Sequence, residues 1–148
     1  AAQEAIQEAL KSAQKRRAPE VSSLSLLLAL ISLDEGVIKR TLDAAHVNRH
    51  ALEAQLEQRL SRGPKVYGEQ EPTPSAGFVS ACQAGERVAE RMGDRYTASE
   101  HLLAGLFDDR EATALLTAQG LTLEGYLKTP GGIQELKPHK AIRFNVRS

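Results

Sequence analysis

The stretch LSLLLALISL, residues 24–33, decides the fold. Drawn as a helix it is apolar on almost every side, and such a helix belongs in the middle of a core with other elements around it. Ser25 and Ser32 interrupt it, and it falls far short of the roughly 20 apolar residues that cross a bilayer. We therefore expect a central buried helix, capped by Ser22 or Ser23, and no transmembrane segment.

Further helices are expected on both sides of this stretch. An amphipathic helix precedes it and stops before Pro19, because proline lacks the amide that a helix interior needs. Two more follow, one after Gly36 and one capped by Asn48, so that four helices precede Gly63. Their inward positions, at helical spacing, are Ala2, Ile6, Ala9, Leu10, Ala13, Val37, Ile38, Thr41, Leu42, Ala45, Leu52, Leu56 and Leu60.

The same order then begins again. Residues 63–74, GPKVYGEQEPTP, contain three prolines and two glycines, which forbid a regular helix and mark a connector. Beyond it a helix ends at Gly93, and residues 97–107, 111–119 and 122–128 predict three more helices. The stripe of the first of these four helices consists of Phe78, Cys82, Gly85 and Ala89.

The two halves align with each other. Placing residue 21 on residue 96 matches VSSLSLLLALI with YTASEHLLAGL, so that the Leu-Leu-Ala of residues 27–29 meets that of residues 102–104. One residue fewer in the next loop then aligns Leu42 with Leu116. The agreement of helix order, loop positions and offset predicts an internal duplication. The expected fold is all-α, with two tandem four-helix repeats related by an approximate twofold axis.

This duplication divides the chain. We assign repeat one to residues 1–62, the connector to 63–74, repeat two to 75–134 and a tail to 135–148. In the tail, apolar residues alternate with polar ones from Ile142 to Arg147, a period of two that fits a strand or a linker and no helix.

Composition excludes several classes of function. Lysine plus arginine equal aspartate plus glutamate at 19 each, so no net positive field would hold nucleic acid. Cys82 is the single cysteine, which rules out an internal disulfide framework and favours a reducing compartment. The N-terminal residues lack the apolar core and cleavage pattern of a signal peptide. The expected location is the cytoplasm.

Two motifs resemble a known family. The signature Tyr96-Thr97-Ala98-Ser99-Glu100-His101-Leu102-Leu103 resembles that of the Clp repeat domain at the N-terminus of Clp-type AAA+ unfoldases and disaggregases. Residues 64–68, Pro-Lys-Val-Tyr-Gly, are similar to the Pro-Lys-Val-x-Gly between repeats of the ClpB-type disaggregases, which often carry a Gly-Gly at the place of residues 131–132. Residues 21–26 of the first repeat lack the glutamate and the histidine.

The resemblance implies six candidate substrate-binding residues, which are Cys82, Ala84, Asp94, Tyr96, Glu100 and His101. The positions matching Asp94 and Glu100 are acidic residues implicated in substrate handling in the ClpB-type branch. Those matching Cys82, Ala84 and His101 are usually leucines that line an apolar groove in that branch. Here they are smaller or more polar, which leaves room for a narrower partner.

Motifs for nucleotide and metal chemistry are incomplete. Gly120 and Gly125 have the glycine spacing of a phosphate-binding loop, but Lys128 does not follow the second glycine directly, as the lysine of that loop must. His46 and His50 are four apart, but the alignment puts His46 in a turn and His50 in the first turn of the next helix, so they are not expected to share a metal. We expect no cofactor.

No nucleophile is expected either. Ser99 and His101 are two apart on a helix and point away from each other, and Cys82 lies on an inward stripe where a thiol is usually inert. Thr97 and Glu100 have the spacing of a capping box, in which the glutamate reaches back to the threonine amide. The domain is therefore expected to be non-catalytic.

Two functions fit this description. In the first, the domain captures exposed segments of unfolded or aggregated proteins, as part of the stress response, and passes them to the ATPase of a hexameric AAA+ chain. In the second, it docks an adaptor or one defined peptide, as in Clp protease unfoldases or the ATPases that recycle secretion-system sheaths. A standalone enzyme is a third class of function, but the sequence has none of the nucleotide, metal or nucleophile motifs that an enzyme of these kinds would need. The isolated domain is expected to be a monomer without nucleic-acid or membrane partners.

Overall fold

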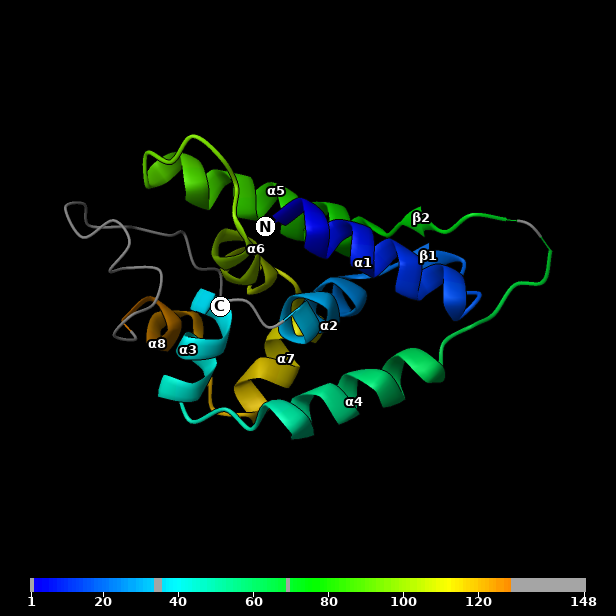
Figure 1. The fold of residues 1–148 in the computed structure, drawn as a ribbon, viewed down its shortest axis with the longest axis horizontal. Coiled ribbons are helices and arrows are strands. Elements are labelled where there is room, and N and C mark those ends of the chain that lie inside the picture. The colour runs from blue at the N-terminus through cyan, green and yellow to red at the C-terminus, as the bar shows by residue number, and fades with distance from the viewer. Residues whose placement is uncertain (1, 34–35, 69, 129–148) are drawn as a thin grey trace.

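The computed structural model describes residues 2–33, 36–68 and 70–128, and these residues form eight helices (Figure 1). The first four are α1 (Ala2–Lys15), α2 (Ser23–Leu33), α3 (Gly36–Ala44) and α4 (Arg49–Ser61). The second four are α5 (Ala76–Arg91), α6 (Ser99–Leu106), α7 (Arg110–Ala118) and α8 (Leu123–Lys128). The predicted all-α class and helix order are confirmed. The predicted tail and the Gly-Gly at 131–132 lie outside the described residues.

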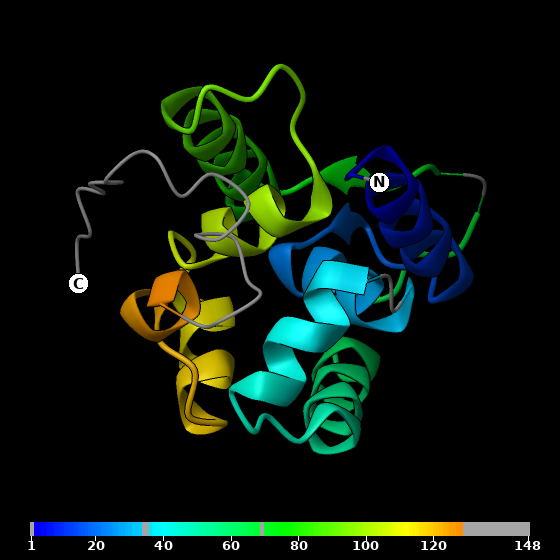
Figure 2. The same cartoon turned by 60° about the vertical axis from the view of Figure 1, so that its left-hand side comes forward.

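The helices α2 and α6 form the centre of the domain and contact each other. The helix α2 also contacts α5 and α7 of the other half, while α6 contacts α1 and α3. Exchanging the halves exchanges these contacts, which is the relation that an approximate twofold axis produces. Figure 1 shows α1 and α5 above this centre with α4 below it, and Figure 2 gives the view after a turn about the vertical axis.

The leucines that the alignment pairs are buried in the core, as predicted. Leu27 and Leu103 are fully buried, and Leu28 and Leu102 are nearly so. In α2 every residue from Ser23 to Ile31 is buried, because neighbouring helices cover it on all sides. Because this central helix has neighbours on every side, each of its faces is buried, and this explains why the stretch is apolar all the way round.

Two glycines allow α5 and α6 to pack closely. A Cβ atom added to Gly105 would lie 2.4 Å from the carbonyl oxygen of Ala81 and 2.5 Å from the amide nitrogen of Gly85. These are backbone atoms that cannot swing away. The sequence pattern placed Gly85 on the inward stripe of its helix, and a Cβ atom added there would lie 3.0 Å from the Leu102 side chain, a tight contact.

Four helices end in the same way, with one residue in the left-handed region of backbone conformation. These residues are Arg17 after α1, His46 after α3, Gly93 after α5 and Gly120 after α7, with φ of 57°, 62°, 76° and 89°. The next amide bonds back to the helix in each case, for example from Ala18 N to Ala13 O at 3.0 Å. A residue with a Cβ in this region costs about 1 kcal/mol or more relative to glycine. Repeat one bears this cost twice and repeat two does not.

The predicted helix caps are mostly present. The Asn48 side chain accepts a hydrogen bond from the amide of Ala51 at 3.0 Å, and Ser22 Oγ accepts one from the amide of Ser25 at 3.2 Å. Asp109 caps α7 by accepting a hydrogen bond from the amide of Ala112. Its carboxylate also accepts a hydrogen bond of 2.8 Å from the hydroxyl of Ser23. This second bond ties the start of α2 to the start of α7 across the two repeats.

The connector is more regular than the sequence predicted. Thr73–Pro74 (β2) pairs in parallel with Glu20–Val21 (β1), which gives a two-stranded sheet between the repeats. Closer to α4, the amide of Val66 donates to the carbonyl oxygen of Arg17 at 2.7 Å. The prolines and glycines of the connector exclude a helix, but these tertiary hydrogen bonds still hold the connector in a defined position. Among the described residues, no helix is both long and apolar enough to cross a membrane.

Candidate functional site

A hollow of about 630 Å³ lies beside the C-terminal half of α5 and the loop that leads into α6. It is lined by Gln83, Glu86, Arg87, Ala89, Glu90, Asp94, Arg95, Tyr96 and Thr97. The hollow therefore brings together Asp94 and Tyr96, two of the six candidate residues. Of the lining residues on α5, Gln83, Glu86, Arg87 and Glu90 share the outward face of that helix, at a spacing of three and four, whereas Ala89 is buried.

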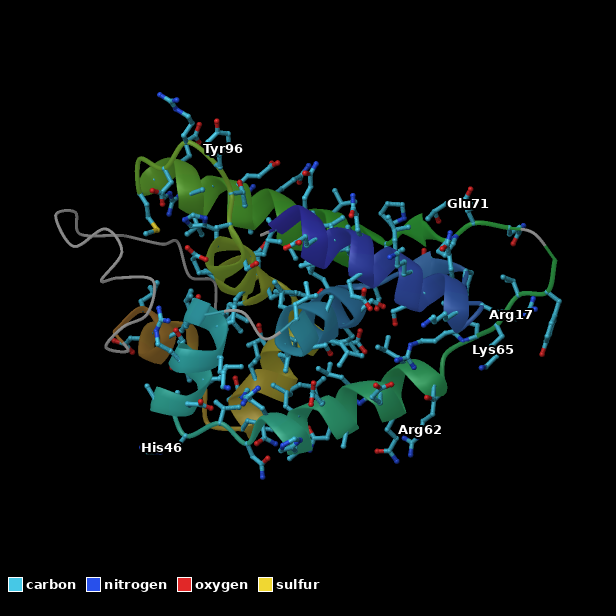
Figure 3. The ribbon with its side chains drawn as sticks, in the orientation of Figure 1. Arg17, His46, Arg62, Lys65, Glu71 and Tyr96 are labelled. Atoms are coloured by element: carbon cyan, nitrogen blue, oxygen red, sulfur yellow. The ribbon has the colours of Figure 1, made fainter. Side chains whose placement is uncertain are left out.

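Tyr96 is the prominent apolar group of this hollow. It is 76% exposed, although large apolar side chains are usually covered in a folded domain. Figure 3 shows it on the loop above α5, pointing outward. A tyrosine offers a large, rigid contact area together with a polar tip, which suits an interface.

Asp94 is held by a buried histidine. Its Oδ2 lies 2.8 Å from Nε2 of His101, and the Nδ1 of the same ring accepts a hydrogen bond from the amide of Ala98 at 2.8 Å. Because Nδ1 accepts, the ring proton is on Nε2 and is donated to Asp94. His101 itself is only 2% exposed. Its ring positions Asp94 and offers little surface to a ligand.

The predicted capping box is wrong in its residues. The helix α6 begins at Ser99, so its N-cap is Ala98 rather than Thr97, and the third helical position is His101 rather than Glu100. His101 takes the role of the glutamate by accepting from the N-cap amide. The reciprocal bond is missing because the alanine side chain has no acceptor. The one-residue shift hid this role in the sequence.

Glu100 lies half-buried on α6 and is not part of the lining. Its carbonyl oxygen accepts a hydrogen bond from the hydroxyl of Tyr126 at 2.9 Å. Burial raises the pKa of Tyr126 well above its usual value, and the negative charge of Glu100 raises it further. Glu100 therefore takes part in the contact between α6 and α8.

The two remaining candidates lie on α5. Ala84 is buried, and Cys82 is half-buried against the core. Burial raises the pKa of the Cys82 thiol, and the carboxylate of Glu86 adds to the effect. A thiol that ionises late is a poor nucleophile at neutral pH.

The residues tested for other chemistry occupy structural positions. His46 ends α3, and His50 lies in the first turn of α4, as the alignment predicted. Gly120 ends α7 and Gly125 lies inside α8, so their spacing reflects helix boundaries. Within residues 2–33, 36–68 and 70–128, no three His, Cys, Asp or Glu side chains form a group that could hold a metal.

The fold and these sequence motifs define the class of the protein. Residues 1–119 match the Clp repeat (R) N-terminal domain, and the chain belongs to this family, a non-catalytic domain of AAA+ chaperones. The predicted resemblance is thereby confirmed.

The chain is similar to the N-terminal region of particular chaperones. It is 28% identical over 150 residues to the chaperone protein ClpB of Mycobacterium tuberculosis H37Rv, covering 97% of this chain and 18% of that protein. It is 31% identical over 132 residues to ClpB of Bdellovibrio bacteriovorus, covering 81% and 15%. The chain thus spans less than a fifth of the length of these relatives.

Solved structures share the fold. The Hsp104 N-terminal domain from Candida albicans superposes with a TM-score of 0.78 at 19% identity, covering 94% of this chain and 90% of that one. The N-terminal domain of the ClpV1 ATPase from E. coli EAEC gives 0.71 at 18% identity, covering 88% and 86%. A ClpV N-domain solved in complex with a VipB peptide gives 0.66 at 16% identity, covering 86% and 80%.

Proposed function

We propose that this domain recognises substrates for a Clp-type AAA+ chaperone of the ClpB type, and that the hollow beside α5 receives exposed segments of unfolded or aggregated proteins. The observation that carries the proposal is the exposed Tyr96 next to Asp94 in that hollow. The ring provides apolar contact area, and the carboxylate attracts basic residues that flank apolar segments.

The proposal extends to the rest of the protein. The domain itself performs no catalysis and binds its clients weakly, because a flexible client loses conformational entropy when it is held. An ATP-driven pore, formed by the remainder of a hexameric chain in the cytoplasm, then takes over the client. The similarity to ClpB chaperones supports such a division of labour.

A second candidate function is the docking of one adaptor or one defined peptide. The lining favours it, because three acidic side chains (Glu86, Glu90, Asp94) and two basic ones (Arg87, Arg95) give a polar hollow rather than an apolar groove. In addition, Cys82, Ala84 and His101 stand at three positions where the resemblance implies leucine. The ClpV N-domain, which shares the fold, was solved with a VipB peptide.

Binding selectivity distinguishes the two functions. The domain is titrated with a denatured reference protein and with an array of unrelated peptides. Client capture predicts weak binding to many apolar peptides, whereas docking predicts tight binding to a peptide of one particular sequence. Tyr96→Ala should weaken binding in either case. Val79→Ala is the control, because Val79 is 41% exposed on the same helix, α5, but does not line the hollow. Equal binding by wild type and Tyr96→Ala would overturn the proposed site.

A further inference from the structure

A second hollow lies at the other end of the molecule, away from α6. It has a volume of about 360 Å³ and is lined by residues at the end of α1 (Gln14, Lys15, Arg17 and Ala18) and by residues of the connector (Val66, Gly68, Gln70 and Pro72). This volume lies at the lower end of the range for ligand-binding clefts, about 300–1,000 Å³. Figure 3 shows Arg17 and Lys65 at this end of the molecule, where α1 and α4 both finish.

The surface around this hollow carries basic side chains without acidic partners. Lys15, Arg17 and Lys65 are exposed, and none of the three forms an ion pair within the described part of the chain. An exposed arginine elsewhere does form such a pair, as Arg59 does with Glu111 at 3.7 Å. Because the chain as a whole is neutral, this is a local excess of positive charge.

Two acidic side chains described at this end of the molecule are already engaged. Glu57 pairs with Arg16 at 2.6 Å, and Glu71 accepts a hydrogen bond from Nε2 of Gln14 at 3.5 Å. They reduce the positive field at the rim without neutralising Lys15 or Arg17. The hollow therefore still offers cationic groups to an incoming anion.

Arg17 stands where glycine would be favourable. It ends α1 in the left-handed region, and the matching residue at the end of α5 is Gly93. Its guanidinium lies 6.0 Å from the centroid of the Tyr67 ring, and that ring is 82% exposed. An exposed contact of this kind adds little to folding. Arg17 therefore places a cation beside an exposed aromatic ring from a backbone position in which glycine would be less strained.

We propose that this surface, formed by Lys15, Arg17, Lys65 and Tyr67 around the hollow, binds a short acidic segment of a partner protein. Side-chain carboxylates would pair with the three cations, and the Tyr67 ring would cover the aliphatic part of the segment. A nucleic acid would need a wider positive field than a neutral chain provides. The site is separate from the hollow beside α5 and does not depend on the function proposed for it.

Two substitutions to glycine test the proposal, because a loss of peptide binding in one of them is expected without any loss of stability. Arg17→Gly removes the cation and relieves the backbone, so the melting temperature should stay the same or rise. His46→Gly is the matched control, because it makes the same backbone change at the end of α3, away from this surface. The probe is a fluorescent peptide of alternating glutamate and alanine, with a glutamine analogue, followed by anisotropy at low ionic strength.

We expect the glutamate peptide to bind more tightly than its glutamine analogue. Arg17→Gly should weaken this binding about three- to fivefold, as expected for one exposed charge pair, while His46→Gly leaves it unchanged. Lys65→Gln should weaken it similarly without touching the backbone. Equal binding of the two peptides, or equal loss in both glycine variants, would overturn the proposal. A single-stranded RNA that competes more strongly than the glutamate peptide would overturn the assignment to a protein partner.

Discussion

The buried imidazole of His101 joins the start of α6 to Asp94, through one hydrogen bond of 2.8 Å to the Asp94 carboxylate and another of 2.8 Å from the amide of Ala98. A leucine at position 101 could make neither bond. The histidine therefore fixes the orientation of an acidic residue at the hollow beside α5.

This arrangement predicts different costs for two substitutions of His101. His101→Leu leaves the Ala98 amide without an acceptor, and it should lower the free energy of unfolding by about 1–3 kcal/mol. His101→Gln should cost less, because glutamine can accept at the third helical position. Denaturant melts measure both. A leucine variant as stable as wild type would show that the two bonds contribute nothing to folding.

Glu100→Gln should leave stability almost unchanged, because the Glu100 side chain does not cap α6. If Asp94 and Glu100 both attract clients, the double variant Asp94→Asn, Glu100→Gln should bind a basic, apolar peptide more weakly. The difference in affinity should shrink at high salt, because screening then weakens the same electrostatic attraction that the substitutions remove. Comparing each single variant identifies the contributing residue. Equal low-salt affinity in all variants would exclude an electrostatic role for the pair.

Leu103→Ala should destabilise the domain by about 2–5 kcal/mol, the usual cost of truncating a buried leucine. Leu103 is fully buried in α6, and its partner in the repeat alignment, Leu28, is buried in α2. Chemical denaturation measures the change. A loss below about 1 kcal/mol would mean that the core closes around the smaller side chain.

Gly105→Ala should be more harmful than Gly85→Ala. Alanine in a helix interior gains up to about 1 kcal/mol over glycine, but overpacking costs about 1–3 kcal/mol or more. The added Cβ at position 105 meets backbone atoms at 2.4 and 2.5 Å, whereas the nearest contact at position 85 is the movable Leu102 side chain at 3.0 Å. Thermal melts of the two variants test this ranking, and the reverse order would contradict the close packing of α5 on α6.

The buried Tyr126 predicts a loss of stability in alkali. Its folded pKa is raised by burial and by Glu100, so the folded state holds the phenolic proton more tightly than the unfolded state does. The resulting stability is complete below the unfolded pKa of about 10 and is lost as the pH rises above it. Tyr126→Phe should show a shallower decline between about pH 9.5 and 11. Parallel declines would mean that another group is responsible.

Much of the fold could be predicted because its determinants are local. Asn48 as a cap and Gly93 as a helix end depend on the chemistry of one or two turns, and the apolar stretch at 24–33 required a buried position wherever its partners lay. The candidate site was less predictable. The start of α6 differed from the prediction by one residue, and this shift moved the capping role from Glu100 to His101.

By itself, the sequence determined the helices, their duplication and the family, because hydrophobic period, helix-ending residues and short motifs are all properties of neighbouring residues. Only the tertiary structure decided which candidate residues meet. It placed Asp94 beside His101 and in one hollow with Tyr96, left Glu100 outside the lining of that hollow, and brought the end of α1 against the connector so that Arg17 and Tyr67 share one surface. The contact of Arg17 with Tyr67 joins segments distant in the chain, and the bond from His101 to Asp94 depends on where α6 begins, so neither follows from a hydrophobic pattern alone.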